Sequence, residues 1–178
     1  MTKFLRTYQS TIYGRYRRAY IIYGTLTGAV LALSVAVQHI VRPDAWPTAS
    51  ENLVSEAILA VAMFAATYHY RSRLPEQKVM LKELLLLDIG MGLVTSVVYG
   101  LLLWLLCGII FPDLTQHFTT QRLALMPPAT DGAEAALAIK AVQAYTAGDW
   151  GFIGGFRTFV MSILIAFFSA LIFRTFIC

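Results

Sequence analysis

Charged side chains are scarce in this sequence. Only 13% of its 178 residues are Asp, Glu, Lys or Arg, whereas 58% are hydrophobic, and the mean hydropathy is +0.65. Ordinary soluble domains carry about 25% charged residues. The formal net charge of +4 is small and unevenly distributed, so it bears on orientation more than on nucleic-acid binding. The composition excludes an ordinary soluble protein and indicates a membrane protein.

Cysteines and catalytic motifs are scarce as well. The two cysteines, Cys107 and Cys178, lie far apart, and there is no CxxC pair or His/Cys cluster. A disulfide framework and a zinc site are therefore not predicted, and Cys107 is interpreted as a small apolar packing residue. The sequence also contains no HExxH, GxSxG or P-loop motif. We expect no metal, no cofactor and no enzymatic activity.

What the chain does contain is a set of long apolar runs. Residues 89–111 are 23 consecutive positions without a charge. At a 1.5 Å rise per residue they make about 35 Å of helix, enough to cross a bilayer core of about 30 Å. Similar runs predict four spans in all, at about residues 20–41, 53–70, 84–111 and 152–173. The first run is longer than the core of a signal peptide, so it is predicted to be a retained helix.

The long stretch between the third and fourth spans, residues 112–151, also has a helical pattern. Asp131 and Glu134 have the spacing of a capping box, and the alanine-rich sequence after them predicts an amphipathic helix closed by Gly148. The predicted fold is an all-α integral membrane four-helix bundle with a helical loop between spans three and four. We expect the whole chain to form one membrane domain.

Lysine and arginine are distributed unequally between the two predicted sides of the membrane. If the N-terminus is cytoplasmic, ten of the 14 lie on the cytoplasmic side and four on the other. The positive-inside rule then predicts that both termini are cytoplasmic and that the long loop is extracytoplasmic. Five of the ten lie among tyrosines in the first 19 residues, a pattern typical of membrane interfaces that also occurs in RNA-binding arms. Because a transmembrane helix follows directly, we expect contact with lipids and not with nucleic acid.

Small residues recur every four positions in three of the predicted spans. At this period they let helix backbones approach closely inside a membrane, where the hydrophobic effect does not drive helices together. The pattern therefore predicts a compact bundle, and it leaves open whether one ridge faces a second subunit. The predicted packing positions are Gly24, Gly28, Gly92, Ser96, Gly100, Gly154, Thr158 and Ser162.

Asp88 is an acidic residue inside the third predicted span. It lies four residues before Gly92, on nearly the same helix face, so we expect it to point into the bundle and not at lipid. Buried acids in membranes often mark ion or proton pathways. The alternative is an acid solvated at the interface or paired with Arg71 or Arg73 of the neighbouring loop.

A second polar group is predicted at the opposite membrane boundary. Gln38 and His39 end the first span, Glu56 begins the second, and Arg157 begins the fourth. A Glu56–Arg157 ion pair would satisfy both charges at partial burial. Two hypotheses remain open: a structural pair that closes the bundle, or a site for an anionic lipid headgroup or small ligand.

The sequence also resembles the domain-of-unknown-function family numbered 4199. The resemblance covers about residues 20–174 and rests on the first-helix opening YGTLTGAVLAL, the Asp88–Gly92 entry and later Tyr99, the FPDL exit and the helical loop before a glycine-led fourth span. Members of that family are small four-helix inner-membrane proteins, mainly from Bacteroidetes, often encoded near polyprenyl-phosphate glycosyltransferases. The resemblance implies the bacterial inner membrane and a helper role in envelope glycolipid assembly, and it implies no catalytic residues.

Two functions are compatible with these features. The first is a non-enzymatic multi-pass membrane subunit that packs against another integral membrane protein or against itself, which the small-residue ridges favour. The alternative is a small lipid- or solute-handling protein, similar to a flippase, that uses the polar group at Gln38, His39, Glu56 and Arg157. Membrane lipids are expected partners in both cases.

Overall fold

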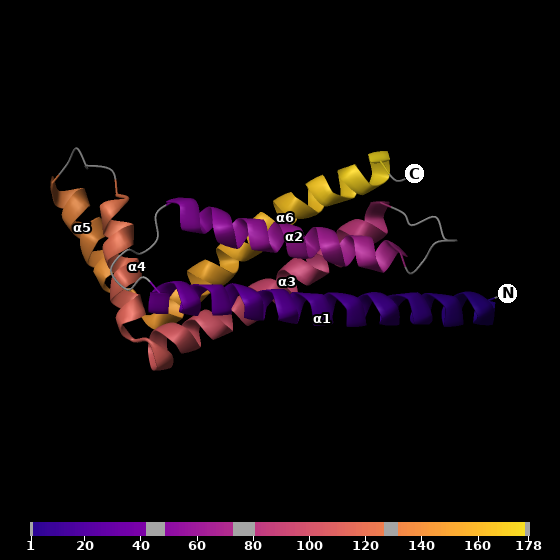
Figure 1. The fold of residues 1–178 in the computed structure, drawn as a ribbon, viewed down its shortest axis with the longest axis horizontal. Helices are drawn as coiled ribbons and strands as arrows, with labels where there is room; N and C mark the ends of the chain where they lie inside the picture. The colour runs from indigo at the N-terminus through magenta and orange to yellow at the C-terminus, as the bar shows by residue number, and fades with distance from the viewer. Residues whose placement is uncertain (1, 42–48, 73–80, 127–131, 177–178) are drawn as a thin grey trace.

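The computed structural model describes residues 2–41, 49–72, 81–126 and 132–176. Within them the chain is helical and contains no strand. Its elements are α1 (Thr2–Val41), α2 (Ala49–Ser72), α3 (Leu81–Leu105), the π-helical turn η1 (Leu106–Ile110), α4 (Asp113–Ala124), α5 (Gly132–Gln143) and α6 (Ala147–Phe176). Figure 1 shows α1, α2, α3 and α6 as a bundle, with α4 and α5 grouped at one end and both termini at the other.

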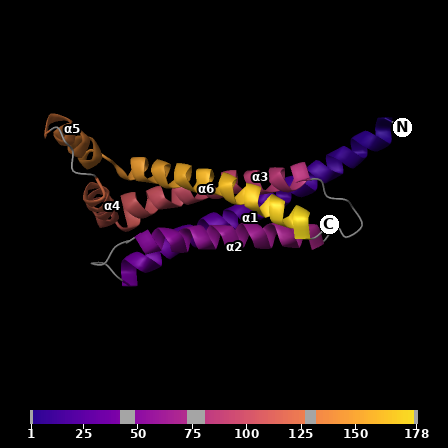
Figure 2. The same ribbon diagram turned by 90° about the horizontal axis from the view of Figure 1, so that it is seen from above.

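Four segments of these helices are long and apolar enough to cross a bilayer. They are Arg17–Val41, Leu53–Ser72, Leu81–Ile110 and Ala147–Phe173. The chain is therefore a multi-pass helical membrane protein, as its sequence predicts. In α1 the helix continues toward the N-terminus beyond the apolar segment, and Figure 2 shows this part extending past the other helices. The 40 residues of α1 correspond to about 60 Å, twice a bilayer core.

The connection between α5 and α6 differs from the predicted one. The amphipathic helix ends at Gln143, and Gly148 belongs to the first turn of α6 and does not close α5. The cause is a cap at Thr146: its backbone N–H and its Oγ1 both donate to Asp149 Oδ2 at 2.7 Å. This cap satisfies polar groups at the start of α6, which consequently begins five residues before the predicted fourth span. The expected cap residue Asp131 lies outside the described residues.

The centre of the bundle is the contact of α3 with α6 on one side and with α1 on the other, while α2 packs less extensively. Gly24 and Gly28 of α1 face α3: a Cβ on Gly24 would lie 2.8 Å from the carbonyl oxygen of Met91. Gly92 and Gly100 of α3 face α6, because a Cβ on Gly100 would lie 2.9 Å from the carbonyl oxygen of Gly151, whereas Gly90 faces Tyr20 of α1. Two of the ridges therefore serve packing within the chain, and helix backbones meet directly at these positions.

Gly151 and Gly155 are packing positions that our reading of the sequence missed. They are four residues apart on α6, and each approaches the α3 backbone: Cβ atoms there would lie 2.7 Å from Gly100 O and 2.8 Å from Ser96 O. The predicted α6 ridge lies beside them, with Ser162 fully buried and Thr158 9% exposed. Their GxxxG spacing, GFIGG at 151–155, is the sequence signal for this contact.

Candidate functional site

Asp88 is fully buried between helices. Its side chain is 0% exposed, and Thr67 of α2, equally buried, donates a hydrogen bond from Oγ1 to Asp88 Oδ1 at 2.5 Å. Ser169 of α6 lies beside the carboxylate. Among the described residues, neither Ser169 Oγ nor Asp88 Oδ2 has a hydrogen-bond partner. The expectation that Asp88 points into the bundle is confirmed, and three hydroxyl or carboxyl groups from three helices meet there.

Arg71 and Arg73 are the two arginines that the sequence offered as partners of Asp88. Arg71 donates from Nη1 to the backbone carbonyl of Phe173 at 2.8 Å, which ties the end of α2 to the end of α6. Arg73 lies outside the described residues. Within the part of the chain that the structure describes, the ion pairs do not include Asp88.

Glu56 and Arg157 are joined across α2 and α6. Arg157 Nη2 donates to Glu56 Oε1 at 2.5 Å, with the side chains 48% and 28% exposed for Arg157 and Glu56 respectively. The pair borders a cavity of about 80 Å³ whose lining also includes Tyr99 and Gly154. A pocket for a small molecule is typically about 300–1,000 Å³. The cavity has room for a few waters but not for a lipid headgroup with its glycerol, so the geometry favours the structural pair.

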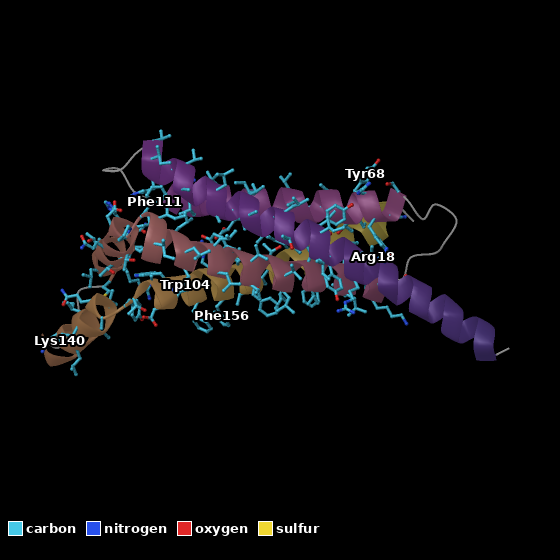
Figure 3. All side chains as sticks on the ribbon, turned by 90° about the horizontal axis from the view of Figure 1, so that it is seen from below. Arg18, Tyr68, Trp104, Phe111, Lys140 and Phe156 are labelled. Carbon is cyan, nitrogen blue, oxygen red and sulfur yellow. The ribbon has the colours of Figure 1, made fainter. Side chains whose placement is uncertain are left out.

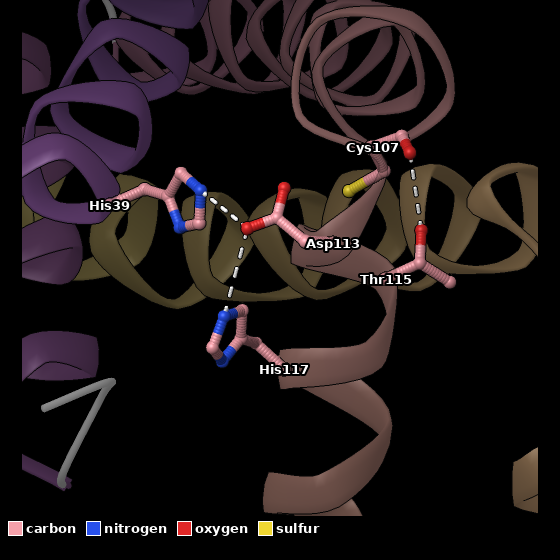
Figure 4. Close-up of polar contacts among 5 residues, drawn as sticks. All are labelled: His39, Cys107, Asp113, Thr115 and His117. Carbon is pink, nitrogen blue, oxygen red and sulfur yellow. Dashed lines mark hydrogen bonds and ion pairs between the residues drawn. The ribbon is translucent and has the colours of Figure 1, made fainter. Parts of the chain in front are cut away.

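His39, near the end of α1, contacts α4. His39 is buried, with 6% exposure, and its Nε2 lies 3.1 Å from Asp113 Oδ2 of α4. His117, one helical turn further along α4, places its Nε2 3.8 Å from the same oxygen (Figure 4). Gln38 is half-buried on the neighbouring position of α1. The sequence prediction did not include Asp113 and His117 as site residues, although their i, i+4 spacing, which begins inside the FPDL exit, is a usable signal.

A groove runs along the outer side of the α3–α6 contact. Its volume is about 580 Å³, and its lining is almost entirely apolar. Exposed Trp104 of α3 and Phe156 of α6 point outward on this side of the bundle (Figure 3). Small residues line it from both helices, and larger apolar ones complete it: Ser96, Gly100, Gly148, Gly151 and Gly155, with Leu93, Val97, Leu101, Phe152 and Phe159.

Comparison with known proteins adds no relative to these observations. No family model, no curated protein and no solved structure matches this chain.

Proposed function

We propose that this chain is a non-enzymatic membrane subunit of the bacterial inner membrane, with both termini cytoplasmic, that packs against a transmembrane helix of another membrane protein or of a second copy. The observation that carries the proposal is the groove of about 580 Å³ between α3 and α6. Its small residues and its open side together provide a surface that a further helix can approach.

Exposed apolar side chains alone do not support a partner, because lipid tails cover them without penalty. Association of helices in a bilayer depends instead on close packing, which small residues permit and which an inserted helix gains by contacting both walls of a groove. Here Gly148, Gly151 and Gly155 line one side and Ser96 and Gly100 the other. Phe152 and Phe156 are 73% and 61% exposed and could wrap an incoming helix.

The alternative is lipid or solute handling through Glu56 and Arg157. Arg157 is about half exposed, which favours contact with an anionic headgroup at the boundary. The cavity of about 80 Å³ beside the pair, however, does not provide a binding pocket for such a molecule. We therefore place this function second. The family resemblance extends the first proposal: the partner would then belong to envelope glycolipid or glycan assembly, and this chain would be its helper.

Photo-crosslinking in cells tests the groove. A photoreactive side chain at Leu101, in the groove, is compared with one at Leu33, which is 62% exposed on α1. We expect a discrete protein adduct from position 101 and none from position 33. The adduct should disappear when Val97→Trp fills the groove. The adduct's mass then separates a second copy, which adds 19.8 kDa, from another protein.

Two results would contradict the proposal. Lipid adducts alone at position 101 would assign the groove to acyl chains and not to a partner helix. Equal protein adducts from positions 33 and 101, insensitive to Val97→Trp, would show random collision in the membrane and not a defined interface.

A further inference from the structure

We propose that His39, Asp113 and His117 form a binding site for a divalent transition metal, of which Zn²⁺ is the best match. The three side chains meet where the end of α1 contacts the start of α4 (Figure 4). One ligand atom from each residue can be chosen so that all three lie within 4.8 Å of one another. The site shares no residue with the lining of the α3–α6 groove, so the proposal does not depend on the proposed function.

The two distances from Asp113 to the histidines are close to those of a tetrahedral zinc site. Metal–ligand distances of 2.0–2.1 Å place two ligand atoms about 3.3 Å apart at the tetrahedral angle. Asp113 Oδ2 lies 3.1 Å from His39 Nε2 and 3.8 Å from His117 Nε2. Small side-chain rotations, chiefly of His117, which is more exposed than His39, would bring the three atoms around one ion.

The donor set also selects the class of metal. Two imidazoles and one carboxylate suit Zn²⁺, Co²⁺, Ni²⁺ or Cu²⁺, whereas Mg²⁺ and Ca²⁺ prefer sites built from oxygen alone. Three protein ligands leave a fourth position of zinc open for water. Asp113 is 57% exposed and His117 34%, so an ion has a path from the surface.

The fold fixes the backbone positions of the three ligands before any ion binds. His39 packs against Phe111, with ring centroids 4.9 Å apart. The π-helical turn η1 ends where Phe111 N–H donates to Leu106 O at 2.7 Å, and Pro112 then starts α4 in a new direction. Leu114, 0% exposed, anchors the first turn of α4 in the apolar core. Asp113 and His117 are thereby fixed against α1 on a regular helix, which a metal site needs.

The same contacts could instead be a hydrogen-bonded His–Asp–His group without a metal, and metal binding itself separates the two. The full chain is purified in detergent, freed of any polyhistidine tag, stripped with a chelator and titrated with Zn²⁺ by calorimetry. Co²⁺ is titrated in parallel by visible absorption. We expect one ion per chain and the intense d–d bands of four-coordinate Co²⁺.

His117→Ala and Asp113→Asn should each weaken Zn²⁺ binding by at least about 100-fold, since loss of an outer-shell partner alone costs about 10–100-fold. His69→Ala is the matched control: His69 is hydrogen-bonded to Tyr23 toward the other end of the bundle, so its loss should leave the affinity unchanged. Both altered ligands are partly exposed, and helical circular dichroism verifies their folding. If the wild-type chain gives no four-coordinate Co²⁺ spectrum, or binds Zn²⁺ no more tightly than His117→Ala, there is no metal site.

Discussion

Individual polar residues inside the bundle are informative because each is expensive to bury alone. Asp88 and Thr67 are both inaccessible to solvent, and the hydroxyl of Thr67 donates a hydrogen bond to the carboxyl group of Asp88. Leaving a buried polar atom without its partner costs about 1–3 kcal/mol, whereas an isosteric amide keeps an acceptor at the same place. The two positions should therefore respond differently to substitution.

We predict that Thr67→Val lowers the free energy of unfolding by about 1–3 kcal/mol, because it strands Asp88 Oδ1, while Asp88→Asn changes it little. Denaturant unfolding in detergent measures both. Ser72→Ala is the control, because the Ser72 hydroxyl donates to the backbone carbonyl of His69 in the same helix and not to a side chain of another helix. A Thr67→Val protein as stable as wild type would show that the bond contributes nothing.

The same Asp88→Asn variant tests the ion- or proton-pathway hypothesis. If the acid carries ions or protons, the variant should fold in normal amounts and lose the cellular function, because the amide cannot ionise. Growth or envelope assays in a strain lacking the chain provide the measurement. Normal function at normal expression would reject the pathway.

Glu56 and Arg157 give a second residue-level prediction. Glu56→Gln and Arg157→Gln should each lower stability by up to about 1 kcal/mol, the range of partly exposed pairs. The double variant should recover part of the loss, because neither charge is then left alone. A double-mutant cycle of melting temperatures measures the coupling, and co-purifying lipid is quantified alongside. Purely additive losses, with lipid lost only in Arg157→Gln, would instead favour the headgroup site.

At the scale of helices, the α3–α6 contact depends on glycine. A Cβ at Gly100 would meet backbone atoms on the other helix, 2.9 Å from Gly151 O and 3.4 Å from Gly155 Cα, and backbone cannot rotate away. We predict that Gly100→Ala destabilises the protein by about 1–3 kcal/mol by forcing the helices apart.

Gly148→Ala is the matched control for this prediction. The nearest atom to a Cβ at Gly148 is Thr146 Oγ1 at 3.6 Å, an ordinary contact, so the alanine should be neutral or slightly stabilising. Thermal unfolding followed by circular dichroism compares the two. Equal effects at positions 100 and 148 would mean that helix propensity, and not close packing, decides the outcome.

At the scale of the whole molecule, both termini lie at one end of the bundle and α4 and α5 at the other (Figure 1). Which end faces the cytoplasm follows from the ten-to-four distribution of basic residues and is a prediction. Single cysteines at Ser72 and Ala138, in a chain lacking Cys107 and Cys178, should differ in labelling. An impermeant thiol reagent should reach position 138 and not 72 from outside the inner membrane, because the bilayer shields the cytoplasmic side. Labelling at position 72 and not at 138 would show that the orientation is the reverse of the predicted one.

The sequence by itself determined the helical membrane class and the four spans, because crossing a bilayer depends on local length and apolarity that are read residue by residue. It also indicated Asp88 as inward-facing and Glu56 with Arg157 as partners, since helix periodicity and charge sign are local properties. The start of α6 was less predictable, because the Thr146 cap extended the helix beyond the apolar run.

Only the tertiary structure decided which faces meet. His39 joins Asp113 and His117 because η1 and Pro112 turn α4 back toward the end of α1. The groove likewise exists because α3 and α6 approach through Gly100, Gly151 and Gly155 and leave their outer side open. Both features depend on the relative rotation and crossing of helices distant in sequence. That arrangement is set by the summed packing of many side chains, which no local pattern specifies.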